Sequence, residues 1–254
     1  MSLPYQHLCV NETKLAMRTC SARNSQQPAV LWLCGFRSDI TGSKATALFN
    51  WAKKKHRSYR CFDYFAHGAS EGAIEDFTLS HAVEDTLSVI TDWEQDHLIL
   101  AGSSMGGWVA LRVMQILNER KTSVKISGMV LVAPAADFTE QLIWEKLDPK
   151  IKNQVMESGL YRRPSAYAHE PYIITRKLIE DGRKHLILDK PFRCSCPIHI
   201  LHGTEDEDVP WQHSLKFMSV VEGSITLSLV KGGDHRLSQP EHIDQLIRAI
   251  EAMR

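Results

Sequence analysis

Short apolar runs alternate along the chain with longer stretches in which apolar residues recur at helical spacing. The short runs predict strands at residues 6–10, 14–20, 29–34, 58–63, 97–101, 127–132, 197–201 and 224–230. The longer stretches predict helices at residues 43–55, 79–93, 106–117 and 210–220, and a last helix from residue 241. Strands that alternate with helices are typical of βαβ units, so the pattern predicts an α/β fold whose central sheet is mostly parallel and flanked by helices.

Two regions depart from this alternation. Only Asn11 and Glu12 separate the first two strands, which favours a hairpin that adds antiparallel strands at the edge of the sheet. Residues 137–189 show amphipathic helical segments with aromatic side chains and no run that predicts a strand. We interpret these residues as a helical cap inserted within a single domain, residues 1–254, and call them the cap segment.

Composition narrows the class of protein further. The chain has 254 residues, of which 43% are hydrophobic, and this size suits one large α/β domain. Thirty basic residues balance thirty acidic ones, so we expect neither nucleic acid nor an anionic lipid surface as a partner. No apolar stretch approaches the roughly 18 to 20 residues of a membrane span.

Cysteine usage and the start of the chain bear on the compartment. The six cysteines form no CxxC pair, which favours free thiols over disulfides or a zinc site. The first residues resemble neither a signal peptide nor a transit peptide. We therefore expect a reducing, cytoplasmic location.

One motif carries a candidate nucleophile. Gly102, Ser104 and Gly106 form G-x-S-x-G between a predicted strand and a predicted helix. A serine on so sharp a turn has a strained backbone, and glycines two residues to either side avoid a collision there. The spacing predicts that Ser104 is exposed for attack on a carbonyl carbon.

Such a serine needs an imidazole as base, and the imidazole needs a carboxylate partner. In this arrangement the histidine follows the last strand, and His235 lies between the last predicted strand and helix. His67 and His202 also fall near the predicted carboxyl edge of the sheet and remain alternatives.

The acid should follow a late strand. Asp206 takes that position in the turn after strand 197–201, and we predict that it orients His235. Asp208 in the same turn and Asp137 after the preceding strand remain alternatives.

Two backbone amides should bind the oxyanion of the tetrahedral intermediate. One belongs to the residue after the nucleophile, Met105, and the other to the loop after the third strand, where Gly35 leaves the amide of Phe36 free. The positive end of the helix that follows Ser104 would support the first donor.

With these residues in place, the chain resembles the α/β-hydrolase superfamily along nearly its whole length. The matching motifs fall in family order: GF at 35–36, FDYFAHGASEG at 62–72, GSSMGGW at 102–108, APAAD at 133–137, HGTEDEDVP at 202–210 and GGDH at 232–235. YRRPSAY at 161–167 and CPIHILHGTEDEDVPW at 196–211 resemble the branch that includes mitochondrial acyl-protein thioesterases and acyl-glucuronide esterases. Ala66 departs from the family pattern, because it replaces the usual loop glycine.

The predicted activity is hydrolysis of a carboxylic ester or thioester through an acyl-enzyme on Ser104. The substrate would be a small ester, an acylated thiol or an S-acylated protein, and neither cofactor nor metal is expected. Two alternatives are C–C bond hydrolysis or perhydrolysis by the same triad, and a non-catalytic protein of this fold that binds an acyl ligand or a partner.

The cap segment would select the acyl group. Its apolar positions at helical spacing either pack within the insertion or line a pocket above Ser104. As pocket residues we predict Trp144, Met156, Leu160 and Tyr161.

Overall fold

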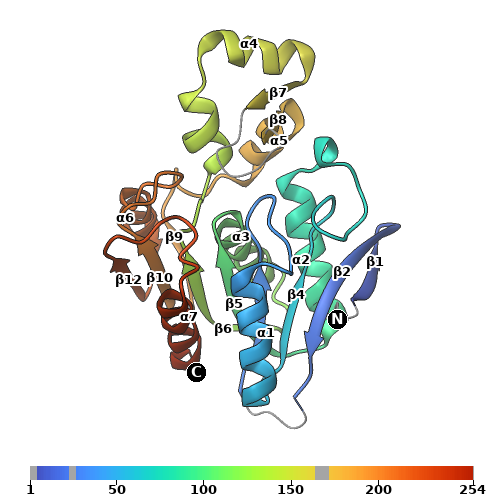
Figure 1. Cartoon of the computed structure of the whole chain (residues 1–254), viewed down its shortest axis with the longest axis vertical. Helices are drawn as coiled ribbons and strands as arrows, with labels where there is room; N and C mark the ends of the chain where they lie inside the picture. The colour runs from blue at the N-terminus through green and yellow to red at the C-terminus, as the bar shows by residue number, and fades with distance from the viewer. Residues whose placement is uncertain (1–4, 23–26, 164–171, 254) are drawn as a thin grey trace.

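One large sheet organises the chain, whose computed structural model describes residues 5–22, 27–163 and 172–253. The eight strands of the sheet lie in the order β1-β2-β4-β3-β5-β6-β10-β12 (Figure 1). In that order their bounds are Gln6–Val10, Thr13–Cys20, Tyr59–Phe62, Ala29–Leu33, His97–Ser103, Lys125–Val132, Ile198–Gly203 and Ile225–Val230. Pairing is antiparallel at β1, β2 and β4 and parallel from β4 to β12. The predicted α/β fold with a mostly parallel sheet is confirmed.

The hairpin at the edge has the expected cause. Asn11 and Glu12 both have positive φ, 47° and 66°, as a two-residue hairpin turn requires. Inside the sheet, all five side chains of β3 are buried, which explains its unbroken apolar run.

Helices cover both faces of the sheet. On one face α1 (Ser43–Lys55) packs against α7 (Pro240–Ala252), and on the other α2 (Leu79–Trp93) packs against α3 (Met105–Glu119). A further helix, α6 (Gln212–Val220), connects β10 toward β12. The loops that follow β3, β5, β6, β10 and β12 leave the same edge of the sheet, because these strands are parallel.

Smaller elements complete the chain. A 3-10 turn η1 (Ile74–Asp76) precedes α2, and β9 (Phe192–Arg193) pairs in parallel with β11 (Val221–Glu222). All six cysteines are free thiols, as predicted. Among the described residues, no helix is long and apolar enough to cross a membrane.

The cap segment forms a lobe beyond the carboxyl edge of the sheet (Figure 1). Its described elements are η2 (Thr139–Ile143), η3 (Trp144–Lys146), α4 (Pro149–Ser158), β7 (Leu160–Arg163), β8 (Tyr172–Thr175), α5 (Arg176–Gly182) and η4 (Arg183–His185). Residues 164–167 of the motif at 161–167 lie outside the described residues.

The prediction that the cap segment contains no strand is wrong. β7 and β8 pair antiparallel, from Leu160 opposite Thr175 to Arg163 opposite Tyr172. Each strand has only four residues, and Leu160 and Tyr161 are half-buried, so neither strand shows a long apolar run. Their hydrogen-bond partners are distant in sequence, which local periodicity does not reveal.

Asp137 joins the two ends of the cap segment. Its buried carboxylate accepts hydrogen bonds from the backbone amides of Ile187 and Leu188, both at 2.9 Å. Burial raises the pKa of Asp137 to about 6, although these amides lower it. The chain therefore leaves the sheet and returns to it at one point.

Candidate active site

Ser104 lies on the sharp turn between β5 and α3. Its backbone is strained, with φ 55° and ψ −119°. The flanking glycines are required by close approach, because a Cβ at Gly102 would lie 2.5 Å from the carbonyl oxygen of Gly106, and one at Gly106 would collide with the carbonyl oxygen of Leu33. The sequence therefore folds here as the motif predicts.

Backbone hydrogen bonds hold this turn rigidly. The amide of Ser104 donates to Val132 O at 2.9 Å, and its carbonyl accepts from Gly107 N at 2.9 Å and Ala135 N at 3.1 Å. Ser104 is half-exposed whereas its neighbours Ser103 and Met105 are buried. The hydroxyl of Ser104 is thus the accessible polar group of the turn.

The loop after β3 lies beside Ser104. A Cβ built on Gly35 would be 3.4 Å from Ser104 Cβ, so the peptide that leads to Phe36 passes next to the serine. Within the described part of the chain, the amides of Phe36 and Met105 donate no hydrogen bond to another residue. Neither predicted oxyanion donor is therefore paired with another described residue in these hydrogen bonds.

The side chain of Phe36 belongs to an aromatic cluster between this loop and the cap segment. Its ring centroid lies 5.6 to 6.1 Å from the rings of His67, Phe77, Phe138 and Tyr172. Burial lowers the pKa of His67 to about 4, and its Nδ1 lies 3.0 Å from the carbonyl oxygen of Phe65. His67 therefore packs as a neutral aromatic residue in this cluster.

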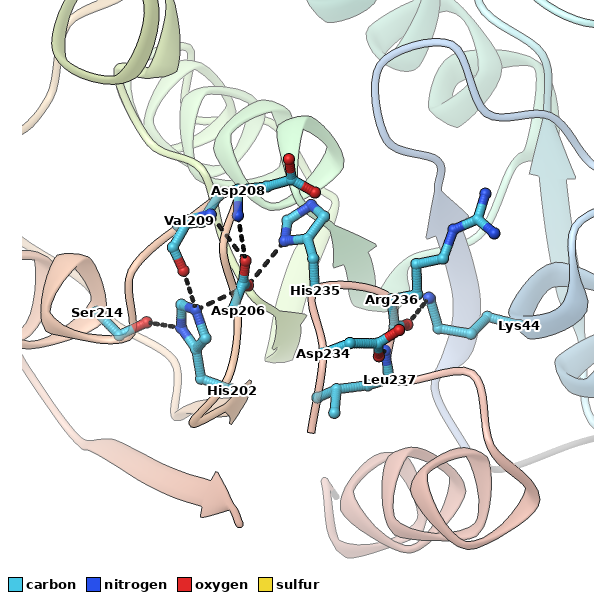
Figure 2. Close-up of polar contacts among 10 residues, drawn as sticks. All are labelled: Lys44, His202, Asp206, Asp208, Val209, Ser214, Asp234, His235, Arg236 and Leu237. Carbon is cyan, nitrogen blue, oxygen red and sulfur yellow. Dashed lines mark hydrogen bonds and ion pairs between the residues drawn. The ribbon is translucent and has the colours of Figure 1, made fainter. Parts of the chain in front are cut away.

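Asp206 and His235 are brought together from two loops at the carboxyl edge. Asp206 Oδ2 lies 2.8 Å from His235 Nδ1, while Oδ1 accepts hydrogen bonds from the amides of Asp208 at 3.0 Å and Val209 at 2.8 Å (Figure 2). Burial raises the pKa of Asp206, but hydrogen bonds from His202, His235 and Val209 outweigh it and lower the pKa to about 2. A permanently charged carboxylate thus faces Nδ1 of His235. Among the hydrogen bonds of the described residues, none joins His235 to Ser104.

The two alternative acids have other surroundings. The carboxylate of Asp137 binds the amides of Ile187 and Leu188. Asp208 is exposed, and one of its oxygens lies within 4.8 Å of ligand atoms of Asp206 and His235. These three residues could share a cation by proximity alone, but both oxygens of Asp206 already accept two hydrogen bonds each.

Sequence reasoning missed the role of His202, which contacts Asp206 on the side away from His235. Its Nε2 lies 3.1 Å from Asp206 Oδ2, and both side chains are fully buried. The available signal was a histidine directly after the apolar run 197–201, because a polar group buried at the end of a strand requires partners.

The four predicted pocket residues are separated in the structure. Tyr161 lines a cavity of about 420 Å³ between the cap segment and the turn after β10, together with Leu142, Ile143, Lys146, Leu147, Asp148, Ile151, Glu207 and Asp208. Leu160 lines a second cavity of about 390 Å³, whose other walls include Glu75, Asp76 and Arg176.

Trp144 and Met156 line neither cavity. The ring of Trp144 is contacted by two cations, Lys152 Nζ at 5.6 Å and Arg183 Cζ at 5.0 Å from the centroid. Met156 is half-buried on α4.

A family model described as the alpha/beta hydrolase family matches residues 31–249. The chain therefore belongs to the α/β-hydrolase family, as its motifs indicated. Together with its thioesterase-named relatives, this makes the chain a hydrolase that acts on ester or thioester bonds.

Particular relatives extend the resemblance over most of the chain. The palmitoyl-protein thioesterase ABHD10, mitochondrial, of Homo sapiens is 32% identical over 228 residues, which cover 89% of this chain and 72% of that protein. The structure of alpha/beta hydrolase domain-containing protein 10 from mouse has a TM-score of 0.86 at 28% identity and covers 98% of this chain and 97% of its own. A crystal structure from Agrobacterium vitis S4 has a TM-score of 0.94 at 39% identity, with 99% of each chain covered. The predicted resemblance to the thioesterase branch is confirmed.

Proposed function

We propose that this chain is a serine hydrolase in which Ser104 forms an acyl-enzyme with a carboxylic ester or thioester. The observation that carries the proposal is the buried Asp206 bound to Nδ1 of His235 at the sheet edge where Ser104 is half-exposed. A carboxylate at Nδ1 holds the hydrogen there and leaves Nε2 as the basic nitrogen.

The first step is attack on the acyl carbonyl carbon. Nε2 of His235 takes the proton of Ser104 Oγ while Oγ bonds to the carbonyl carbon. His235 and Ser104 form this hydrogen bond when substrate is present, since such contacts commonly tighten only in the complex. The charge of Asp206 stabilises the imidazolium that results.

The oxyanion is held by the amides of Phe36 and Met105. These two donors come from different elements, and the strained turn at Ser104 and the passage of Gly35 fix them beside the nucleophile. Met105 is also the first residue of α3, so the positive end of the helix dipole supports the same negative charge.

The intermediate then collapses and expels the leaving group. The thiolate or alkoxide takes the proton from His235, and the acyl group remains on Ser104 Oγ. Water attacks this acyl-enzyme with His235 again as base, which releases the carboxylic acid and restores the serine.

The substrate class follows from the cap segment, which we propose to be residues 137–189 of a single domain. The cavity of about 420 Å³ is lined partly by apolar residues and Tyr161 and partly by the charged residues Lys146, Asp148, Glu207 and Asp208. A carboxylate oxygen of Asp208 lies within 4.8 Å of a ring nitrogen of His235, which supports a cavity close to the catalytic pair. An apolar acyl chain gains about 0.8 kcal/mol per buried methylene in such a site. Together with the palmitoyl-protein thioesterase name of the relatives, this supports an acyl thioester, on a small thiol or on protein cysteine, as substrate. The same role for Trp144, Met156 and Leu160 stays a prediction.

A fluorophosphonate probe tests the proposal, because covalent labelling requires an activated serine. Wild-type protein should be labelled, Ser104→Ala should not, and the neighbouring control Ser103→Ala should retain labelling. Absence of labelling in the wild type would favour a non-catalytic binding protein.

Matched ester and thioester series of increasing acyl length then define the bond and chain preference. If the protein does not hydrolyse esters or thioesters, turnover of a diketone would favour C–C bond hydrolysis. Turnover of hydrogen peroxide with an acyl donor would then favour perhydrolysis.

The location in the cytoplasm stays a prediction, since the relatives are named mitochondrial. Fractionation of cells that express the native gene would decide it.

A further inference from the structure

A second imidazole lies on the far side of Asp206 from His235. His202 belongs to β10, and its side chain is fully buried. Its Nε2 lies 3.1 Å from Asp206 Oδ2 and 2.8 Å from the carbonyl oxygen of Val209, and its Nδ1 lies 2.7 Å from Ser214 Oγ (Figure 2).

These contacts assign one hydrogen of His202. The carbonyl oxygen of Val209 can only accept, so Nε2 carries a hydrogen and donates it to Val209 O and Asp206 Oδ2. Nδ1 forms a hydrogen bond with the hydroxyl of Ser214. Three partners therefore fix the ring, and its donor edge faces Asp206.

Four hydrogen bonds hold the carboxylate of Asp206 in one orientation. Oδ1 is held by the amides of Asp208 and Val209, and Oδ2 lies between the rings of His202 and His235. A rotation away from His235 would also break the hydrogen bond from His202, whose Nε2–H would then have Val209 O as its one acceptor. The hydrogen bond from His202 also helps to lower the pKa of Asp206 to about 2, so the carboxylate stays charged.

We propose that His202 is a positioning residue of the hydrolytic site, which holds the Asp206 carboxylate in the orientation that fixes His235. The inference rests on the proposed function, in which His235 takes the proton of Ser104. His202 acts through Asp206. One connected chain of hydrogen bonds runs from Ser214 through His202 and Asp206 to His235.

The same strand offers a matched control. His199 also belongs to β10, and its Nε2 lies 2.9 Å from the hydroxyl of Ser228 on the neighbouring strand β12. It is thus a second histidine–serine pair on this strand, with no hydrogen bond to Asp206 among the described residues.

The test compares His202→Leu, His202→Gln and His199→Leu on one thioester substrate. His202→Leu should lower kcat about 10- to 100-fold with KM within about twofold of wild type, since substrate does not contact His202; this corresponds to about 1.4–2.8 kcal/mol in the activation barrier. His202→Gln should stay within about fivefold of wild type, because its amide nitrogen can donate from the place of Nε2. His199→Leu should stay within about twofold.

A double-mutant cycle separates positioning from folding. In an Asp206→Asn background, His202→Leu should cost less than about twofold in kcat, because the residue through which it acts is already impaired. The proposal would be overturned if the fold-loss of kcat in the double variant equalled the product of the losses in the two single variants. A wild-type kcat for His202→Leu alone would also overturn it.

Folding is checked by circular dichroism. If His202→Leu does not fold, Ser214→Ala decides, because it removes only the hydroxyl that holds Nδ1: a severalfold lower kcat supports the inference and an unchanged kcat refutes it. Failure of the proposed function is distinct, since Ser104→Ala and Asp206→Asn would then hydrolyse the substrate as well as wild type.

Discussion

Ser104→Gly is expected to stabilise the folded chain, whereas Ser104→Ala is not. Ser104 has φ 55° and ψ −119°, a conformation that glycine adopts freely and that every residue with a Cβ adopts at a cost. Alanine keeps the Cβ and therefore the strain. Both variants lack the hydroxyl, so both should lose hydrolysis and probe labelling.

The magnitude follows from two opposing terms. A residue in so sparsely populated a region of φ and ψ stores about 1–3 kcal/mol. Glycine also gains about 0.5–1 kcal/mol of conformational freedom in the unfolded chain, which opposes the relief. The free energy of unfolding of Ser104→Gly should therefore exceed that of Ser104→Ala by up to about 2.5 kcal/mol, or up to about 10 °C in Tm for a domain of this size.

Urea unfolding and differential scanning calorimetry measure this difference. Ser219, exposed on helix α6, is the control, because glycine in a helix is about 1 kcal/mol less stable than alanine. At Ser104 the glycine variant should thus be more stable than the alanine variant, and at Ser219 it should be less stable. If Ser104→Gly proves less stable than Ser104→Ala, the turn stores less strain than glycine costs in conformational freedom, and this reasoning is wrong.

Three further predictions concern the acid, a buried carboxylate and a strained loop. Asp206→Asn should lower kcat by roughly 10⁴, whereas Asp208→Asn and Asp137→Asn should leave most activity, and a large loss at Asp137 instead would move the acid one strand earlier. Burial raises the pKa of Asp85 to about 7, so the free energy of unfolding should fall by up to about 4 kcal/mol as pH rises from about 4 to 7. Asp85→Asn keeps an acceptor for Phe65 N–H and should reduce this decrease in the free energy of unfolding, measured by urea titration at each pH. If the variant shows the same pH dependence as wild type, Asp85 is not its source. Ala66→Gly should raise the free energy of unfolding by up to about 1 kcal/mol, because Ala66 has φ 60°, and a lower Tm would show that the loop tolerates a Cβ there.

Much of the fold could be predicted because its information is local. The unbroken apolar run of β3 reflects burial on both faces, and the polar pair Asn11 and Glu12 reflects a turn that only a few residue types adopt readily. The spacing Gly102, Ser104 and Gly106 records a close approach of backbone to backbone. Each signal depends on a few neighbouring residues.

What could not be predicted depends on partners distant in sequence. The strands Leu160–Arg163 and Tyr172–Thr175 form a sheet only with each other, and neither is fully buried. The helical spacing of Trp144 predicts a pocket residue, and it does not reveal that Lys152 and Arg183 contact the ring. The contacts of His202 with Asp206 and Ser214 form only in the folded chain, so its sequence neighbours do not reveal them.

The hydrogen bonds of Asp137 make the cap segment a unit that can vary in length without displacing the sheet. Asp137 and the amides of Ile187 and Leu188 are 50 and 51 residues apart in sequence, yet hydrogen bonds fix them together. An insertion or deletion between these points leaves both attachment points in place, and doubling the length of a closed loop costs only about 0.6 kcal/mol. On the proposed function, the residues of the cap segment can therefore change while Ser104 and the Asp206–His235 pair keep their geometry. Such a change would alter which substrate is bound without altering the residues proposed to cleave it.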